Sequence, residues 1–529
     1  MIKISSKSNS KGFIILTIAN IMSKVLSLVY IPFLMATIGD EGYGIYYAAY
    51  NVYAFIFTLT ISGTSAAIPK LIAEYSSKGE EDDAMASFII GRRILLVMGI
   101  LMTGTLFLLS EQLVSFIGYQ KAYLAILALC PSILLTAINS SYRSYFQGRN
   151  NITPIAISQF VEQVGNTIFT IACSYILMNI SLEWGVAGGA MGTAIGASFS
   201  LIFLFFVYKK EKKITESKPR SSTNKDILTY MIKYSVPLIL STGLIYAGNN
   251  LIDVSNIKSG LLQAGFTESA ATIRYGNFGN YIQLMNVPMI IISSLSITAF
   301  PIIAKANASL NMDVLKKNIQ QIFKICFLIA IPSSVGLSIL SSPIFDMIFV
   351  TSQSKGSDIM KFGSFIIIFN AMFQLSNTIL NSIGKVYKGT FSAMLGVVIK
   401  ILSNFILIPI ASINIYGAII GLFLSQSIPF IWNHKHIKQH IGTSESLVDS
   451  WKKPLISSLF MGAVVAVLYK VLNTSLNIIL GAYISNALAV LICVYIGALV
   501  YIHSLLKIKG LNSDDIETVP SKFRRILFL

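Results

Sequence analysis

Long apolar segments follow one another along almost the whole chain, and this repetition limits the available folds more than any other feature. A helix needs about 20 apolar residues to cross the hydrocarbon core of a bilayer. The apolar segments cover approximately these fourteen ranges: 12–38, 43–73, 87–110, 122–146, 153–179, 185–208, 227–250, 275–304, 318–350, 359–383, 387–410, 414–433, 454–472 and 476–505. They predict an all-α integral membrane protein with about fourteen transmembrane helices.

Charge is scarce in this chain, which supports the membrane interpretation. Only 12% of the 529 residues are charged and 54% are hydrophobic, with a mean hydropathy of +0.70. A water-soluble protein needs more charge to cover its surface. The first apolar segment, from Gly12 to about Gly39, is too long for the core of a signal peptide, so we expect no cleaved leader.

The basic residues predict how the chain is oriented. If the N-terminus is cytoplasmic, 32 of the 40 Lys and Arg residues fall in cytoplasmic segments. The outward connections hold five, namely Lys121, Lys258, Arg274, Lys355 and Lys361. Cytoplasmic loops of membrane proteins are enriched in Lys and Arg in this way. We therefore expect an even number of spans and two cytoplasmic termini, and the net charge of +17 needs no nucleic-acid partner.

Two polar stretches divide the apolar segments into groups of six, six and two. The longer stretch has the composition of a flexible linker. The predicted division is an N-terminal six-helix bundle at 1–208, a cytoplasmic linker at 209–226, a C-terminal six-helix bundle at 227–433, a cytoplasmic loop at 434–453, helices 13 and 14 at 454–505, and a cytoplasmic tail at 506–529.

The two six-helix halves show weak internal similarity. Three patterns recur: Tyr145-Phe-Gln-Gly-Arg-Asn with Asn381-Ser-Ile-Gly-Lys-Val, Glu162-x-x-x-Asn166 with Lys400-x-x-x-Asn404, and Gly188-x-x-x-Gly192 with Gly417-x-x-x-Gly421. Both halves start on the same side, so we expect parallel repeats with the substrate path between them. The glycines, continued by Gly196, predict a face for close helix packing.

No pattern in the sequence indicates covalent chemistry. The chain has no P-loop, no Ser-His-Asp set and no metal motif, and each of its four cysteines lies inside an apolar segment. His434, His436 and His440 fall in the expected cytoplasmic loop, where we interpret them as solvated residues rather than metal ligands. We expect no cofactor and no metal.

Several segments carry the resemblance to a known family. They are Ser23-Lys-Val-Leu-Ser, Ile38-Gly-Asp-Glu-Gly-Tyr-Gly-Ile-Tyr, Ala67-Ile-Pro-Lys-Leu-Ile-Ala-Glu, Arg274-Tyr-Gly, Gln283-Leu-Met-Asn-Val-Pro and Ile331-Pro-Ser-Ser-Val-Gly-Leu. Together they resemble the SpoVB/YtgP-type polysaccharide exporters of the MOP flippase superfamily, which include lipid II flippases. The resemblance implies two six-helix bundles in a V, alternating access, and a groove for a polyprenyl tail beside helices 13 and 14.

The resemblance also implies basic residues in a cavity that receives a diphosphate. Lys24 lies about 13 residues into the first helix, roughly 19 Å deep, where a charge is expensive and indicates function. It is the favoured diphosphate contact, with a structural salt bridge as the alternative. Similar flippases place an acidic residue after helix 1 and a basic residue in helix 8, which here are Asp40 or Glu41 and Arg274. The segment 43–73 carries no basic residue before Pro69.

Other charges have more than one interpretation. Glu162 and Lys400 occupy matching spacings in the two halves, so they could pair across the cavity, Glu162 could take a coupling ion, or the two could be unrelated. Asp253 is a candidate gate or ion residue. Arg92, Arg93 and Arg143 either anchor helices at the cytoplasmic surface or gather anionic headgroups.

The sequence therefore predicts a transporter of the bacterial plasma membrane rather than an enzyme. The favoured substrate is an undecaprenyl-pyrophosphate-linked glycan, with peptidoglycan lipid II first among them. Another polyprenyl-linked polysaccharide, a cation-coupled drug exporter or a non-transporting scaffold are the alternatives. Energy would come from the membrane potential, Na+ or H+, since the chain has no ATPase motif. We expect a monomer whose partners are the glycan lipid and membrane lipids.

Overall fold

The computed structural model describes residues 6–211, 220–309, 311–349, 356–443 and 446–510. Side chains are described from Met22 onward, except those of Lys24, Val25 and Leu28. The described residues form helices and no strand, as the apolar segments predict. Contacts divide the chain into two compact units, Met1–Gly276 and Asn277–Leu529.

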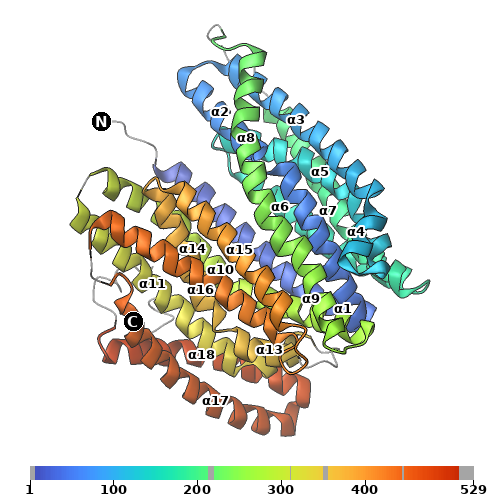
Figure 1. The fold of residues 1–529 in the computed structure, drawn as a ribbon, viewed down its shortest axis with the longest axis vertical. Coiled ribbons are helices and arrows are strands. Elements are labelled where there is room, and N and C mark those ends of the chain that lie inside the picture. Colours follow the sequence, from blue (N-terminus) through green and yellow to red (C-terminus); the bar gives the residue numbers. More distant parts are fainter. Residues whose placement is uncertain (1–5, 212–219, 310, 350–355, 444–445, 511–529) are drawn as a thin grey trace. The chain divides into compact units, whose positions relative to one another are not determined.

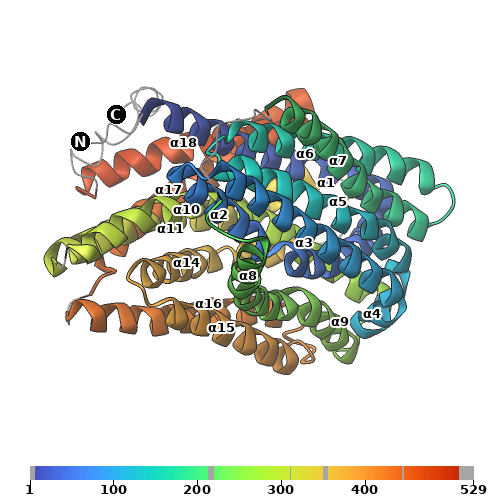
Figure 2. The same cartoon turned by 90° about the horizontal axis from the view of Figure 1, so that it is seen from above.

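The first unit is a bundle of long helices with short connections (Figure 1). Its elements are α1 (Ser6–Ile61), α2 (Thr64–Lys78), α3 (Glu81–Leu108), α4 (Ser110–Ile117), η1 (Gln120–Ala122), α5 (Tyr123–Gly148), α6 (Thr153–Leu177), α7 (Leu182–Glu211), α8 (Asn224–Tyr246), η2 (Ala247–Ile252), α9 (Asp253–Gln263) and the first turns of α10 (Glu268–Ala308). Figures 1 and 2 show α5, α6 and α7 side by side, with α1 against them.

Two glycines break the first long helical stretch. The backbone of Gly39 leaves the helix at φ 71°, between the expected segments 12–38 and 43–73. Gly63, at φ 80°, separates α1 from α2. A positive φ is accessible to glycine at little cost because it has no Cβ. The expected segment 43–73 is therefore two helices, the end of α1 and most of α2.

The second unit continues α10 and adds eight further α-helices in the part of the chain that the structure describes. They are α11 (Met312–Ile339), α12 (Ser341–Ile348), α13 (Gly356–Gly363), α14 (Ile366–Ser382), α15 (Val386–Leu407), α16 (Tyr416–Ile441), α17 (Lys452–Leu480) and α18 (Ala482–Lys507), with the short η3 (Asp449–Trp451) before α17.

Each of the fourteen apolar segments overlaps a helix, but not every helix is apolar enough to count as a membrane span. Among the described residues, ten helices are long and apolar enough, or eleven if the bent pair α13 and α14 forms one span. The helices α6 and α16 are not among the ten. Polar side chains within α6 lower its hydropathy. The chain is a multi-pass membrane protein, and the number fourteen stays a prediction.

Glycines let α6 and α7 approach closely in the first unit. A Cβ added to Gly188 would lie 2.5 Å from the Cys173 carbonyl oxygen, and one added to Gly192 would collide with Thr170. Gly196 lies equally close to the backbone of Glu162. The expected packing face is thus confirmed, because only hydrogen leaves room for the backbone of the neighbouring helix.

The second unit repeats this glycine contact between α15 and α16. A Cβ on Gly417 would lie 2.8 Å from the backbone nitrogen of Ile408, and one on Gly421 would collide with Asn404. The pattern that recurs in the sequence therefore recurs in the packing of each unit by itself.

The helix α8 packs against the first unit, although the polar linker suggested that it opens the second bundle. Gly63 lies against the backbone of Ser235, and Thr64 Oγ1 donates to Ser235 Oγ at 3.4 Å. The ammonium of Lys70 lies 5.3 and 4.8 Å from the ring centroids of Tyr230 and Tyr234. The division by contacts therefore falls at Gly276, inside α10, rather than in the linker.

The end of the linker is held by a buried carboxylate at the start of α3. Asp83 is fully buried, and its oxygens accept from Arg220 Nε at 2.8 Å and from the Ser221 backbone nitrogen at 2.7 Å. Thr223 and Asp226 then form a capping box that begins α8. Residues 220–226, which we expected in a flexible linker, are therefore ordered.

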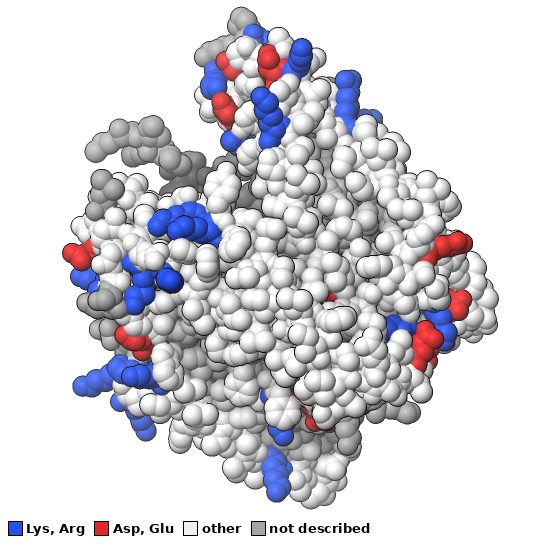
Figure 3. Space-filling view, viewed as in Figure 1, with Lys and Arg blue, Asp and Glu red and all other residues white. Residues whose placement is uncertain are grey.

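On one face of the first unit, exposed charged side chains lie near the two ends of the helices (Figure 3). On the face drawn in Figure 3, Lys, Arg, Asp and Glu gather at the start of α8 and beside α4, and the surface between them is almost uncharged. An apolar band between two charged ends is what a bilayer requires of the protein surface.

Candidate functional site

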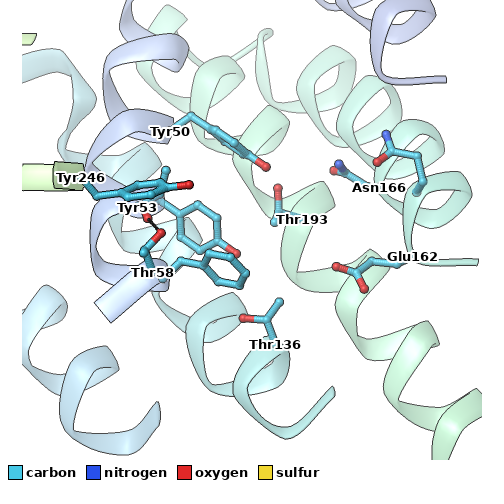
Figure 4. A pocket seen from close by; sticks show the side chains of 11 residues that line it. Tyr50, Tyr53, Thr58, Thr136, Glu162, Asn166, Thr193 and Tyr246 are labelled. Atoms are coloured by element: carbon cyan, nitrogen blue, oxygen red, sulfur yellow. Dashed lines mark hydrogen bonds between the residues drawn. The ribbon is translucent and has the colours of Figure 1, made fainter. Parts of the chain in front are cut away.

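A cavity of about 330 Å³ opens inside the first unit. Five helices contribute to it, α1, α5, α6, α7 and α8, through the side chains of Tyr50, Tyr53, Ala54, Phe57, Thr58, Thr136, Glu162, Gln163, Asn166, Thr193 and Tyr246. Figure 4 shows the tyrosines on one side of a common space and Glu162 and Asn166 on the other. The lining therefore combines four aromatic side chains with six polar ones and one alanine.

Two of the three tyrosines, Tyr50 and Tyr53, come from a stripe along α1 after the break at Gly39, and Tyr246 ends α8. Residues three and four apart lie on one face of a helix, and aromatic residues recur at that spacing at 43, 46, 47, 50, 53 and 57. Neighbouring rings touch, with centroids 5.9 Å apart for Tyr46 and Tyr50 and 5.4 Å apart for Tyr50 and Tyr53. Our interpretation of the sequence missed this stripe, although its spacing was a visible signal.

Glu162 brings the one carboxylate to the cavity wall, and that carboxylate is paired. Arg143 Nη2 lies 2.5 Å from Glu162 Oε2. The same guanidinium donates to Ser158 Oγ at 3.0 Å and to Ser200 Oγ at 2.9 Å. Charged groups inside a membrane protein are stabilised by such pairing. The wall therefore carries a fixed ion pair with little net charge.

Two other polar groups of the cavity wall have no hydrogen-bond partner within the described part of the chain. They are Thr193 Oγ1 and Gln163 Nε2, and both atoms are buried. The Thr193 residue is only 7% exposed. Buried polar groups are nearly always satisfied in proteins, by protein, water or ligand. These two groups therefore indicate that the cavity receives a polar occupant.

A second polar cluster joins the expected outward connections of the first unit. Lys121 Nζ lies 2.9 Å from Glu41 Oε1, and Ser269 Oγ donates to Glu41 Oε2 at 2.6 Å. Lys258 Nζ lies 2.9 Å from Glu268 Oε1, and 4.0 Å from the ring centroid of a buried tyrosine, Tyr119. The basic residues counted as topological signals thus also connect three separate segments of the chain.

Three of the four residues expected to contact a diphosphate, Asp40, Glu41 and Arg274, lie in or next to the segments of this cluster. The side chain of Lys24 lies outside the described residues, although its backbone belongs to α1. Asp40 and Glu41 follow the break at Gly39, and Arg274 stacks on Phe266 with its guanidinium carbon 4.2 Å from the ring centroid. The role of all four in binding stays a prediction.

The remaining candidate charges of the first unit occupy different environments. Asp253 is buried at the start of α9. Arg92 Nη1 donates to Tyr142 Oη at 3.5 Å and stacks on Phe88, whereas Arg93 is exposed. Arg143 is not a free surface cation, because Glu162 holds it.

Lys400 is buried on α15 in the second unit, and its expected equivalence with Glu162 is wrong by one helical turn. A Cβ on Gly192 would lie 2.8 Å from the carbonyl oxygen of Asn166, whereas a Cβ on Gly421 would lie 3.5 Å from that of Lys400. Lys400 is thus the packing equivalent of Asn166. The position equivalent to Glu162, one turn earlier on α15, is Gly396. The pairing of Glu162 with Lys400 stays a prediction.

The histidine cluster lies on a helix and not in a loop, because α16 continues to Ile441. The ring nitrogen Nδ1 of His436 lies 3.1 Å from Lys388 Nζ, and His440 Nε2 lies 2.7 Å from Asn307 Oδ1. Burial, and then the nearby charge of Lys385, lower the pKa of His440. In the described residues no group of three His, Cys, Asp or Glu is placed to hold a metal ion.

Comparisons with known proteins place this architecture among the membrane transporters of the MOP superfamily. Its fold matches an inward-facing MATE family multidrug transporter of that superfamily with a TM-score of 0.67, at 15% identity over 80% of this chain and 96% of the other. It matches lipid II flippase MurJ in an inward closed conformation with a TM-score of 0.66, at 16% identity over 98% of this chain and all of the other.

A model of the family described as polysaccharide biosynthesis protein matches residues 10–307, and the chain belongs to that family. Its relatives in Bacillus subtilis (strain 168) include the lipid II flippase MurJ, 25% identical over 97% of this chain and 98% of the relative. Stage V sporulation protein B is 27% identical over 78% of this chain and 80% of the relative. The expected superfamily is confirmed, and with it a membrane transport protein rather than an enzyme.

Proposed function

We propose that this protein is an alternating-access flippase that moves undecaprenyl-pyrophosphate-linked glycan precursors from the inner to the outer leaflet of the bacterial plasma membrane. Peptidoglycan lipid II is the cargo that we favour. One observation carries the proposal: the chain matches a protein named lipid II flippase from end to end, over 97% of its own length and 98% of that relative.

We infer the corresponding membrane topology from the distribution of charge. Fourteen spans form two six-helix bundles and a C-terminal pair, with both termini in the cytoplasm. Support comes from the 32 of 40 basic residues on the cytoplasmic side of this arrangement and from the helix found at each apolar segment. The protein works as a monomer in this proposal.

The diphosphate of the cargo requires cations along its path. We assign this role to Lys24 and Arg274, and we place Asp40 or Glu41, the acidic residue after helix 1, in the same binding cavity. Lysine and arginine keep their charge when they are paired with an anion in a polar cavity. Arg93 and Arg92, near the cytoplasmic end of α3, are in position to attract anionic headgroups.

No cofactor takes part in this proposal. The membrane potential, Na+ or H+ supplies the energy, and the charged residues Glu162, Lys400 and Asp253 are the candidates for coupling. An ionisable group inside a membrane protein commonly marks an ion or proton path.

Two other cargoes fit the same fold. The description of the matching family, polysaccharide biosynthesis protein, favours another polyprenyl-linked polysaccharide as the cargo. The fold match to a MATE transporter favours a cation-coupled drug exporter. Paired charges at the cavity wall offer a cationic drug less attraction than a free carboxylate would.

Complementation tests the proposal. Cells depleted of their own lipid II flippase should regain growth and surface-exposed lipid II when they express this chain. Lys24→Ala should abolish the rescue, while Lys470→Ala, an exposed lysine on α17, should leave it intact. Normal membrane insertion without rescue would contradict lipid II as the cargo.

A further inference from the structure

We propose that the cavity of the first unit binds the glycan part of the lipid-linked cargo. The inference rests on the proposed function, and it names the part of the cargo that this cavity recognises. The lining combines three tyrosines and a phenylalanine with a carboxylate, two amides and three hydroxyl-bearing threonines. Carbohydrates present apolar C–H faces together with hydroxyl groups that both donate and accept, and this lining offers surfaces for both.

The size of the cavity fits a sugar. Its volume of about 330 Å³ lies at the lower end of the roughly 300–1,000 Å³ found for small-molecule pockets. This space accommodates a pyranose ring and excludes a long polyprenyl chain. The polar wall also disfavours such a chain, because burying Glu162 and Asn166 against hydrocarbon would leave them without polar neighbours.

The charge of the cavity wall favours a neutral polar ligand over an ion. Arg143 already compensates the carboxylate of Glu162, so a cation would gain little there. For the same reason the diphosphate of the cargo would find no free cation among the side chains that line the cavity. A neutral sugar avoids both difficulties, and it can donate hydroxyl protons to the paired carboxylate in a charge-assisted hydrogen bond.

The unpartnered groups locate two contacts of the glycan. Thr193 Oγ1 and Gln163 Nε2 are buried at the wall and have no partner among the described residues. An amide N–H can donate to the carbonyl oxygen of an N-acetyl group, and a hydroxyl can pair with a sugar hydroxyl. Tyr50 lies beside Thr193 in the space that Figure 4 shows, and it contributes an aromatic ring to the same lining.

Translocation by the full chain in lipid vesicles tests this inference with two lipids. One is lipid II, and the other is undecaprenyl diphosphate, which lacks the sugar. Thr193→Val removes a hydroxyl that has no protein partner, so it should leave folding intact while it slows lipid II about fivefold, the effect of one lost hydrogen bond. Tyr50→Leu should slow lipid II by a similar factor. Neither variant should slow undecaprenyl diphosphate.

A matched control is available on α6. Thr167 Oγ1 is also buried without a partner in the described part of the chain, but Thr167 does not line the cavity. Thr167→Val should therefore leave the translocation of both lipids unchanged. Equal slowing of the two lipids by Thr193→Val would show that Thr193 does not act through the sugar. No slowing of either lipid would show that its hydroxyl does not contact the cargo. Either result would overturn the inference.

A binding measurement separates this inference from the proposed function. N,N′-diacetylchitobiose, a soluble disaccharide of N-acetylglucosamine, should bind the detergent-purified protein, and Thr193→Val should weaken that binding about fivefold. If wild-type protein binds the disaccharide in this way but moves neither lipid, the proposed function fails and the glycan site stands. If the wild-type protein moves lipid II while Thr193→Val changes neither disaccharide binding nor transport, only the proposed glycan site is rejected.

Discussion

The helix pairs α6–α7 and α15–α16 pack alike but carry different chemistry. In the first pair Gly188 and Gly192 admit the backbone of α6, and in the second Gly417 and Gly421 admit α15. In the first unit, Glu162 on α6 pairs with Arg143 on α5. The equivalent positions in the second unit hold Gly396 and, counted from the matching helix ends at Asn150 and Gly384, Asn377. The repeat thus preserves the backbone contact, whereas the two positions of the ion pair are not occupied by charged residues in the second unit.

This difference shows which residues of an internal repeat can be used to align its two halves. Small residues at a helix contact are fixed by geometry, because any side chain collides with the facing backbone. A side chain that lines a cavity has no such constraint and follows the ligand or the partner. The two halves are therefore aligned more reliably by residues with the same packing contacts than by residues with a charge at the same spacing.

The largest expected effect comes from exchanging charges between the repeats. Glu162→Lys places an ammonium beside Arg143, and two like charges about 4 Å apart repel by roughly 4 kcal/mol at an effective dielectric constant of 20. Transport should fall at least about a hundredfold. Adding Lys400→Glu should not restore it, because Lys400 is the equivalent of Asn166. Restored transport in the double variant would show that Glu162 and Lys400 pair after all.

Breaking the ion pair by neutral substitution should have the next largest effect. Arg143→Met leaves the partly buried Glu162 without its cation, which we expect to lower the free energy of unfolding by about 3 kcal/mol. Ile379→Met, at a buried apolar site on α14 of the second unit, should cost under about 1.5 kcal/mol, since it keeps the volume. Thermal unfolding in detergent measures both. Equal losses would mean that the pair has no special role.

The glycine contacts should respond unequally to a methyl group. Gly192→Ala meets the backbone nitrogen of Thr170 as well as its side chain, so we expect a loss of about 2 kcal/mol in stability. Gly421→Ala meets only the side-chain oxygen of Asn404 at close range, and that side chain can turn away. Gly421→Ala should therefore lower the free energy of unfolding by less than about 1 kcal/mol. The opposite order in the same unfolding assay would contradict the proposed register.

The smallest effect is expected at the outward surface. Lys121 and Glu41 are half and about a quarter exposed, and exposed ion pairs contribute roughly 0.2–1 kcal/mol. Lys121→Met should therefore shift the unfolding temperature only slightly, and less still in 1 M salt, which screens such pairs. A loss comparable with that of Arg143→Met would mean that this cluster, and not the cavity wall, carries the main polar stabilisation of the first unit.

The sequence predicted the helices well because hydrocarbon imposes length and composition on each segment. It also predicted the glycine face of α7, since four-residue spacing places small residues on one side of a helix. It could not predict that Arg143 meets Glu162, because the two lie on different helices and no local rule relates them. The assignment of Lys400 to Glu162 was wrong for a related reason: a spacing of four residues fits several registers equally well.

The cavity shows the same limit. Tyr50 and Tyr53 were visible as a helical stripe, yet a stripe alone does not distinguish a ligand wall from ordinary packing. Thr193 carried no signal at all, because its importance lies in a hydrogen bond that the protein does not make. The attachment of α8 to the first unit was likewise hidden, since it depends on Asp83, which lies far away in the sequence.

The contacts of Asp83 with the residues before α8 determine which segments can move together during transport. Residues 220–226 are fastened to α3, so only residues 212–219 lie between that attachment and the end of α7. These residues join two helices of the first unit, and the chain passes to the second unit only within α10. We expect α8 to move together with the first unit. During transport the chain should then bend in the backbone of α10, after Gly276.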